Sequence, residues 1–196
     1  MTVSPQLRAL GILCALILTG CTSPAPTTPN PATPSPTTSA TSTPTLTTTW
    51  STGQVAAIKA VEDYNLASAK IGANPSAFSK AEMRNLLQRS IGGAMIEANV
   101  QGFQSMRSQG YHREGSAAIV WTVATDVADD GRGLEVHVTQ CRDQTSIRIV
   151  DKAGSPAPEV EFQYPSHNLR QYSVRKPPGE ESFRVFGMQT VNGACP

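Results

Sequence analysis

The chain has 196 residues, with 16 basic and 15 acidic side chains and a formal net charge of +1. The sequence holds no run of Lys and Arg, which argues against a nucleic-acid-binding protein. It also lacks a basic amphipathic helix of the kind that binds anionic lipid surfaces. Composition adds no other class, so function has to be argued from individual segments of the chain.

The first twenty residues have the pattern of an export signal. Arg8 supplies a positive charge before the apolar stretch Ala9 to Leu18, whose ten residues would span about 15 Å as a helix, too short for a permanent transmembrane helix. The next residues complete Leu18-Thr19-Gly20-Cys21, which resembles the lipobox of bacterial lipoproteins. The resemblance implies cleavage between Gly20 and Cys21 and diacylation of Cys21. The alternative is an ordinary secretory peptide that happens to contain a cysteine.

A tether is predicted for residues 21–49. All but two of residues 22–49 are Thr, Ser, Pro or Ala, so the segment has no apolar surface whose burial would offset the entropy of ordering. Fully extended, it would reach on the order of 85 Å. Such tracts also form O-glycosylated stalks, and a bare spacer fits the composition equally well.

Residues 50–196 have the size of one domain with its own core. Loss of Arg8 with the leader leaves fifteen basic and fifteen acidic residues. Cys14 leaves with the leader and Cys21 carries lipid, so Cys141 and Cys195 remain. In an exported domain we expect them to pair, closing a loop of about 55 residues worth roughly 4 kcal/mol. The alternative is two free thiols with a redox or metal role, but no CxxC motif or zinc-ligand spacing accompanies them.

Three helices are predicted at the start of the domain. Capping-box patterns at Ser51 and Ser79 begin the first two helices. The first ends at Gly72, the second breaks at Gly92-Gly93, and the third ends at Gly110.

Antiparallel strands are predicted after the helices. Alternation over residues 119–127 puts Ile119, Trp121 and Val123 on one buried face, and residues 134–138 return across a turn. A third strand is expected at 145–150, and a last hairpin at 169–175 and 182–190. Helices followed by such a meander predict an α+β fold with the helices on one face of a curved sheet.

Three short motifs carry a resemblance to a known group: residues 138–143 (VTQCRD), residues 149–154 (IVDKAG), and Phe183-Arg184-Val185 with Gly193-Ala194-Cys195. They resemble the Cys-x-Asp strand, turn and aromatic-x-Val…Gly-x-Cys ending of extracytoplasmic lipoproteins of actinobacteria and their phages. Those proteins join a lipobox, a Thr/Pro tether and a domain of the NTF2-like superfamily. The resemblance covers Thr52 to Cys195, although Phe183 stands where many such proteins have Trp. It implies a cone in which N-terminal helices pack on a strongly curved antiparallel sheet, with a pocket between them.

In some members of that superfamily the pocket is an isomerase, cyclase or dehydratase site, and in many it is a binding cavity or a packed core. An isomerase site needs a carboxylate base and a Tyr or acid oxyanion hole, for which Tyr64 and Asp126 are the nearest candidates. Strand alternation predicts that Asp126 lies outside the cone, and Tyr64 is more simply a core aromatic.

The three histidines suggest no site either. His137 shares a polar strand face with Glu135, while His112 and His167 fall in connecting segments. Because the GxSxG, HExxH and Walker A motifs are also absent from the sequence, we assign no catalytic residue, metal ligand or cofactor.

The sequence therefore favours a non-enzymatic domain, lipid-anchored at Cys21 on the extracytoplasmic side of the cell membrane. It would bind an envelope protein or a small apolar ligand. The alternative is an isomerase- or dehydratase-like enzyme acting on a small apolar substrate. The pocket discriminates between them: two or more convergent polar side chains in a cavity of a few hundred Å³ favour the enzyme, and a filled interior excludes it.

Overall fold

The computed structural model describes residues 49–157, 166–193 and 195. The expected leader, the cleavage point Gly20, the lipidation site Cys21 and the tether up to residue 48 lie outside the described residues. The helices are α1 (Thr52–Ala73), the 3₁₀ turn η1 (Pro75–Ala77), α2 (Lys80–Leu87) and α3 (Ala94–Gln109). The strands are β1 (His112–Glu114), β2 (Ala118–Ala124), β3 (Ala128–Asp129), β4 (Leu134–Asp143), β5 (Arg148–Val150), β6 (His167–Lys176) and β7 (Arg184–Val191). No helix in this part of the chain has the length and apolar character needed to cross a membrane.

The three helices begin where the sequence predicts, and α1 and α3 also end there, but α2 ends at Leu87, before the expected break at Gly92-Gly93. The Ser51 hydroxyl accepts a hydrogen bond from the backbone nitrogen of Gln54, whose side chain accepts one in return from the backbone nitrogen of Ser51. Ser79 and Glu82 form the same reciprocal pair at the start of α2. Each capping box satisfies backbone donors that the first helical turn leaves without partners. Helix α3 ends at Gly110 in the left-handed conformation.

The main sheet is antiparallel with the strand order β2-β4-β6-β7, and β3 extends it beside β4. This confirms the predicted meander and the last hairpin. The expected strand at residues 145–150 is corrected: only Arg148–Val150 form β5, which pairs with β1 in a separate two-stranded sheet. The reason is that β4 already has a neighbour on each side, β2 and β6, so the chain leaves the main sheet before returning as β6.

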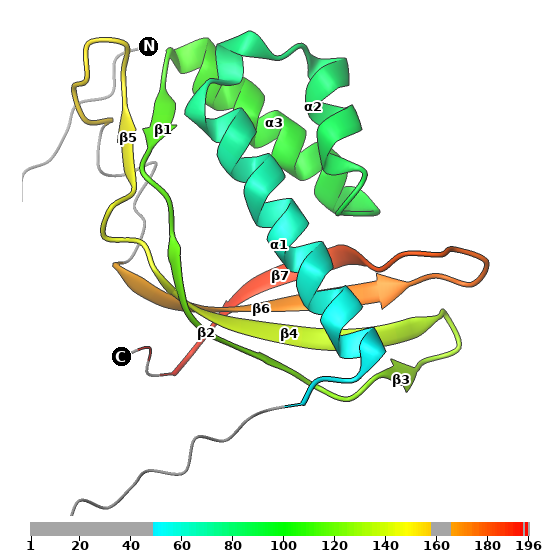
Figure 1. The fold of residues 1–196 in the computed structure, drawn as a ribbon. Coiled ribbons are helices and arrows are strands. Elements are labelled where there is room, and N and C mark those ends of the chain that lie inside the picture. The colour runs from blue at the N-terminus through cyan, green and yellow to red at the C-terminus, as the bar shows by residue number, and fades with distance from the viewer. Residues whose placement is uncertain (1–48, 158–165, 194, 196) are drawn as a thin grey trace, which may run out of the picture. The chain divides into compact units, whose positions relative to one another are not determined.

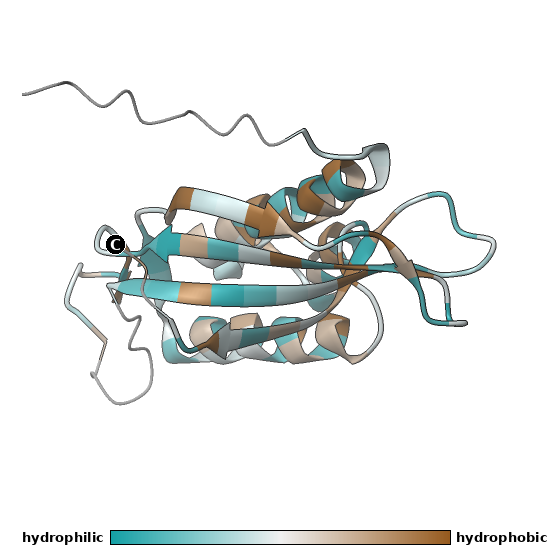
Figure 2. Ribbon diagram, turned by 90° about the horizontal axis from the view of Figure 1, so that it is seen from below, coloured by the Kyte–Doolittle hydropathy of each residue, from teal (hydrophilic) through white to brown (hydrophobic). Residues whose placement is uncertain are grey.

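The helices lie on one face of the main sheet, and α1 crosses the strands (Figure 1). Strand β4 presents Val136 and Val138 to this face, and β6 presents Tyr172 and Val174. All four are fully buried, and they pack in one core with the helices. Helix residues of that core include Ala57, Val61, Ile71, Met83, Leu87, Val100 and Phe103. Figure 2 shows hydrophilic and hydrophobic segments alternating along the strands, as expected for a sheet with one covered face.

Strand β2 departs from its predicted pattern. The sequence places Ile119, Trp121 and Val123 on one buried face, yet Ile119 and Val123 are exposed. A register shift between Ile119 and Trp121 pairs Ile119 with Arg142 and Trp121 with Cys141. Directly paired residues share a face of the sheet, so this irregularity turns Trp121 and Val123 to the face away from the helices.

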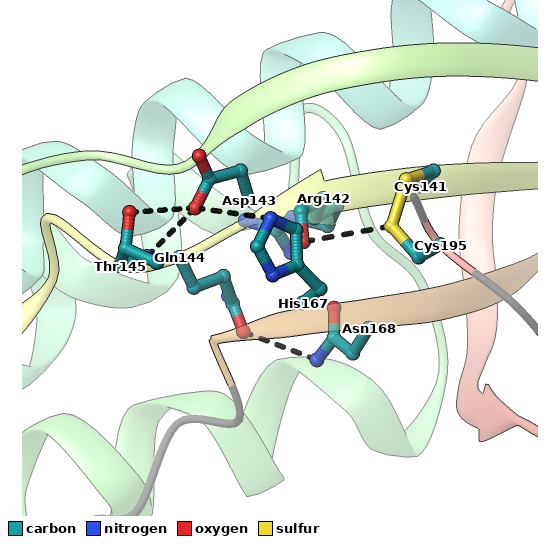
Figure 3. The surroundings of a disulfide bond; sticks show 8 residues. All are labelled: Cys141, Arg142, Asp143, Gln144, Thr145, His167, Asn168 and Cys195. Carbon is teal, nitrogen blue, oxygen red and sulfur yellow. Dashed lines mark hydrogen bonds and ion pairs between the residues drawn. A yellow bond between two sulfur atoms is a disulfide. The ribbon is translucent and has the colours of Figure 1, made fainter. Parts of the chain in front are cut away.

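The predicted disulfide between Cys141 and Cys195 is present (Figure 3). Cys141 is fully buried on β4, and the bridge holds the C-terminal segment against that strand. The architecture of the described domain is therefore α+β, with the end of β4 held by a covalent bond on one side of the sheet.

Candidate binding cavity

A cavity of about 690 Å³ lies between α1, α3 and the strand ends on the helix-covered side of the sheet. Its walls are formed by side chains of α1 and α3, by the segment from β1 to the start of β2, and by residues of β4, β6 and β7. This volume is within the range of small-molecule sites. The described domain therefore has a ligand-sized pocket beside its packed core.

Much of the cavity lining is apolar. It includes the large apolar side chains of Leu66, Phe103, Met106, Ile119 and Met188. Six large apolar side chains are exposed in the described residues, and three of them, Leu66, Ile119 and Met188, line this cavity. Half of these exposed apolar side chains therefore lie where a ligand could cover them.

Helix α3 also leaves space in this lining at Gly102. A Cβ atom built on Gly102 would meet no atom within 4 Å. The residue lies in the middle of a regular helix, where glycine is unfavourable relative to alanine. Helical structure therefore does not explain the glycine, and its lack of a side chain leaves the cavity open.

The cavity lining also carries positive charge, and Arg142 is the direct cross-strand partner of Ile119. The charged residues that line the cavity are Arg113, Arg142, Arg170 and Glu62. Arg142 is only 6% exposed. Its Nη1 donates to the Tyr172 hydroxyl at 3.2 Å, and its Nε has no hydrogen-bond partner among the described residues. Burial lowers the pKa of Arg142, and the nearby charge of Arg170 lowers it further, against the opposing effect of Tyr172.

No carboxylate compensates Arg142 or Arg170 within the described residues. The one polar contact of the Arg170 guanidinium there is from Nη1 to the Met188 sulfur at 3.5 Å. Most other arginines of the domain have acidic partners: Arg84, Arg132, Arg148, Arg175 and Arg184 pair with Glu97, Asp130, Glu114, Asp130 and Glu180. Among the described residues, Arg142 and Arg170 therefore differ from most arginines of the domain in lacking an acidic partner, and both lie in the same cavity.

A hydrogen-bonded network holds the polar part of the lining in place. The Tyr172 hydroxyl, which accepts from Arg142, donates to Asn65 Oδ1 at 3.5 Å. Asn65 Nδ2 donates to Gln140 Oε1 at 3.1 Å. Because Asn65 belongs to α1 and the other three residues to β4 and β6, the network ties the helix to the sheet and orients Arg142.

Tyr64 is part of the core, as predicted for an aromatic residue of the first helix, and it also lines the cavity. It is buried, its hydroxyl donates to Asn99 Oδ1 at 3.0 Å, and its ring meets Tyr172 edge-on at 6.4 Å between centroids. Burial raises the pKa of Tyr64, and the neighbouring Tyr172 adds to the increase. Asp126, its candidate partner, is exposed and does not line the cavity. The structure therefore does not bring the two together.

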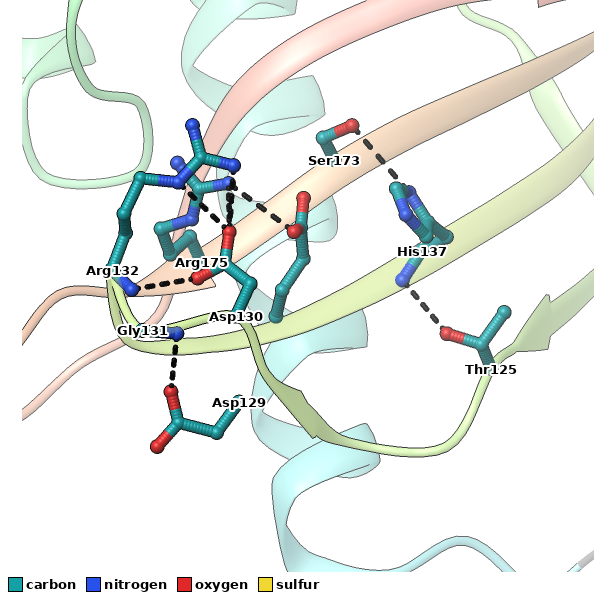
Figure 4. A network of polar contacts seen from close by, with 9 residues as sticks. Thr125, Asp129, Asp130, Gly131, Arg132, His137, Ser173 and Arg175 are labelled. Carbon is teal, nitrogen blue, oxygen red and sulfur yellow. Dashed lines mark hydrogen bonds and ion pairs between the residues drawn. The ribbon is translucent and has the colours of Figure 1, made fainter.

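His137 is half-buried on the sheet face away from the cavity (Figure 4). Its backbone nitrogen donates to the Thr125 hydroxyl at 3.0 Å, and its Nδ1 lies 3.4 Å from the Ser173 hydroxyl. In the same view, Asp130 accepts hydrogen bonds from Arg132 and Arg175. The contacts of His137 join neighbouring segments of the sheet, so they indicate a structural role for this residue.

The other two histidines do not lie in connections as expected, because β1 and β6 begin with them. Nε2 of His112 is 3.9 Å from Glu114 and Nε2 of His167 is 3.8 Å from Asp143. Within the described residues, no three His, Cys, Asp or Glu side chains are arranged to hold a metal ion.

The sequence argument missed Arg142 and Arg170 as site residues. A signal for Arg142 exists: alternation along β4 places it on the same face as Val136, Val138 and Gln140, all of them buried. A charged residue that continues a buried strand face is unusual and indicates a functional or paired group. Arg170 carries a similar signal, because alternation along β6 places it on the same face as the buried Tyr172 and Val174.

Comparison with known protein families finds no family model that matches this chain, and no curated protein sequence matches it. Among solved structures, the chain is similar to the intermembrane-space region of the chloroplast protein ARC6, with a TM-score of 0.50 and 11% identity, covering 71% of this chain and 97% of that one. A de novo designed β-sheet protein solved by NMR matches with a TM-score of 0.32 and 15% identity, covering 71% and 92%. At such identity the ARC6 likeness concerns the α+β fold alone.

Proposed function

We propose that the chain is an extracytoplasmic lipoprotein, held at the cell membrane by acyl chains on Cys21, whose domain binds a ligand in the cavity without transforming it. In this proposal the domain has the NTF2-like cone form, and the residues between Cys21 and the domain are the tether. The lipobox pattern supports the anchor, and a disulfide between Cys141 and Cys195 fits an exported protein.

The observation that carries the binding function is the cavity itself, whose lining combines apolar side chains with buried polar groups. Glu62 is the one carboxylate among the described residues that line it, and Glu62 is exposed. Proton-transfer chemistry in an apolar pocket needs a base within reach of a buried substrate. The described lining offers guanidinium, amide and phenol groups instead, which hold a ligand and do not abstract a proton at neutral pH.

The alternative, an isomerase- or dehydratase-like enzyme, is favoured by one observation. Tyr64, Asn65 and Asn99 converge on a cavity of several hundred Å³, which is the arrangement we named as the enzyme's signature. Tyr64 would supply an oxyanion-hole donor in such an enzyme. Glu62 would have to serve as the base from the exposed face of α1, and for this reason we place binding first.

Metabolic labelling with an alkyne analogue of palmitate tests the anchor. We expect the wild-type chain to be labelled and the Cys21→Ala chain to remain unlabelled. Cys14→Ala is the matched control, because Cys14 lies in the part of the leader that cleavage removes, so this variant should be labelled like wild type. Label retained in Cys21→Ala would contradict acylation at that residue.

Native mass spectrometry of the mature protein, released from membranes, tests ligand binding. We expect a small molecule bound to wild type and absent from Gly102→Phe, a variant that fills the cavity from α3. A ligand that keeps its mass on prolonged incubation supports a binding domain, whereas a change in its mass supports the enzyme. The same adduct on both proteins, or none on either, would contradict a ligand in this cavity.

A further inference from the structure

We propose that the cavity takes a single-chain carboxylate, a fatty-acid-like molecule whose head group lies between Arg142 and Arg170 and whose apolar chain lies along α3. This inference rests on the proposed binding function and adds the chemical class of the ligand.

The first argument is charge. Arg142 is buried, lacks a partner at Nε and forms no ion pair in the described part of the chain. A buried cation without a counter-charge is unfavourable, and buried charges in proteins are ordinarily paired. Arg170 adds a second positive charge close enough to lower the pKa of Arg142. An anion bound between the two guanidinium groups would compensate both charges.

The second argument is the geometry of the donors. A guanidinium presents parallel N–H groups that match the two oxygens of a carboxylate. Tyr172 contacts one nitrogen of Arg142, and through Asn65 this contact connects to the helix. The fork of Arg142 is therefore held before any ligand arrives, which lowers the entropy cost of binding.

The third argument is the size and lining of the cavity. A volume of about 690 Å³ is far more than a small inorganic anion occupies. The remaining space is bordered by Phe103, Met106 and Ile119, and it opens past Leu66, which is 68% exposed. Covering this surface with an apolar chain removes it from water and is favourable. A molecule with one anionic end and one apolar end suits both the arginines and the apolar side chains of this lining.

Calorimetric titration of the mature chain tests the proposal. The protein is exported behind an unrelated cleavable signal and carries Cys21→Ser, so that no acyl group of its own competes for the cavity. The probes are dodecanoate, dodecanol, dodecylammonium, dodecyl phosphate and acetate, which separate the head group from the chain. We expect dodecanoate to bind about tenfold tighter than dodecanol or dodecylammonium, and acetate to give no measurable binding.

Two variants locate the site. Arg142→Met keeps the length of the side chain and removes its charge, and it should weaken dodecanoate binding by about tenfold or more while changing dodecanol binding by less than about twofold. Gly102→Phe should weaken binding of both probes, because it fills the space beside the apolar side chains of the lining. If Arg142→Met fails to fold, Arg170→Met, at a half-buried position, provides the same comparison.

Several results would overturn the inference. Equal affinity for dodecanoate and dodecanol would show that the head group is not recognised, and tighter binding of dodecyl phosphate would assign the site to phosphate esters. Unchanged dodecanoate affinity in the charge-removing variant would place the head group elsewhere. If dodecanol or dodecylammonium binds best and Gly102→Phe abolishes that binding, only the carboxylate assignment falls. If no probe binds and no ligand is found by mass spectrometry, the proposed binding function falls as well.

Discussion

Breaking the bridge between Cys141 and Cys195 should cost the domain a large part of its stability. The two cysteines are 54 residues apart, and the loop they close contains β5, β6 and β7. In the chain-entropy model, a loop of this length raises the free energy of unfolding by about 4 kcal/mol at room temperature. Single domains are stable by about 5–15 kcal/mol in total. Cys195→Ser is the suitable change, because Cys141 is fully buried and tolerates a thiol better than a hydroxyl.

Urea unfolding of the mature chain, followed by circular dichroism with and without a thiol reductant, measures this effect. We expect reductant to lower the unfolding midpoint of the wild-type protein to that of Cys195→Ser, and to leave the midpoint of the variant unchanged. The variant is thus its own control for other effects of the reductant. Equal midpoints for oxidised and reduced wild type would refute the reasoning, because loop closure would then contribute nothing to stability.

Four further substitutions test local structure with the same urea assay. Gly102→Ala should raise the free energy of unfolding by about 1 kcal/mol, since its Cβ enters open space on a helix. Gly115→Ala should lower the free energy of unfolding by about 2 kcal/mol or more, since φ is +74° there and the Cβ meets the backbone of Ser146. Ser79→Ala should cost about 1 kcal/mol through loss of the α2 cap, and no change would mean that the cap is dispensable. Hydrogen bonds from Thr145 hold the pKa of Asp143 below its usual 3.8. The ionised carboxylate therefore stabilises the folded domain above that pH, and this contribution is lost as the pH falls through the lowered pKa. Asp143→Asn should make the free energy of unfolding less dependent on pH in the acid range.

The helices could be predicted because their ends are determined locally. The reciprocal bonds of Ser51 and Ser79 involve residues three positions apart, and a left-handed Gly110 needs no distant partner. The last hairpin is similarly local, because β6 and β7 adjoin in the chain. Where neighbouring residues settle the conformation, the pattern in the sequence is sufficient.

The predictions for β2 and β5 failed because pairing with another strand determines the orientation of β2 and the sheet to which β5 belongs. Alternation assumes an unbroken register, and the irregularity between Ile119 and Trp121 is set by pairing with β4, which the sequence of β2 does not reveal. The segment containing β5 was assigned to the main sheet because its residues favour strands. Its actual partner, β1, lies 34 or more positions away and was expected to be a polar connection.

The same reasoning explains the site. Cys141 and Arg142 are consecutive on β4, and because side chains alternate across a strand they serve opposite faces of the sheet. The sequence directs attention to the cysteine, whose pairing can be deduced by counting, whereas the position of Arg142 on the apolar face of β4 is a weaker signal. Only the packing of α1 and α3 over that face turns Arg142 into a buried cation at a cavity. Cys141 thus supplies the bridge on one face of the sheet, and the next residue, Arg142, supplies the guanidinium on the other. The bridge therefore also restrains the backbone that holds Arg142 at the cavity.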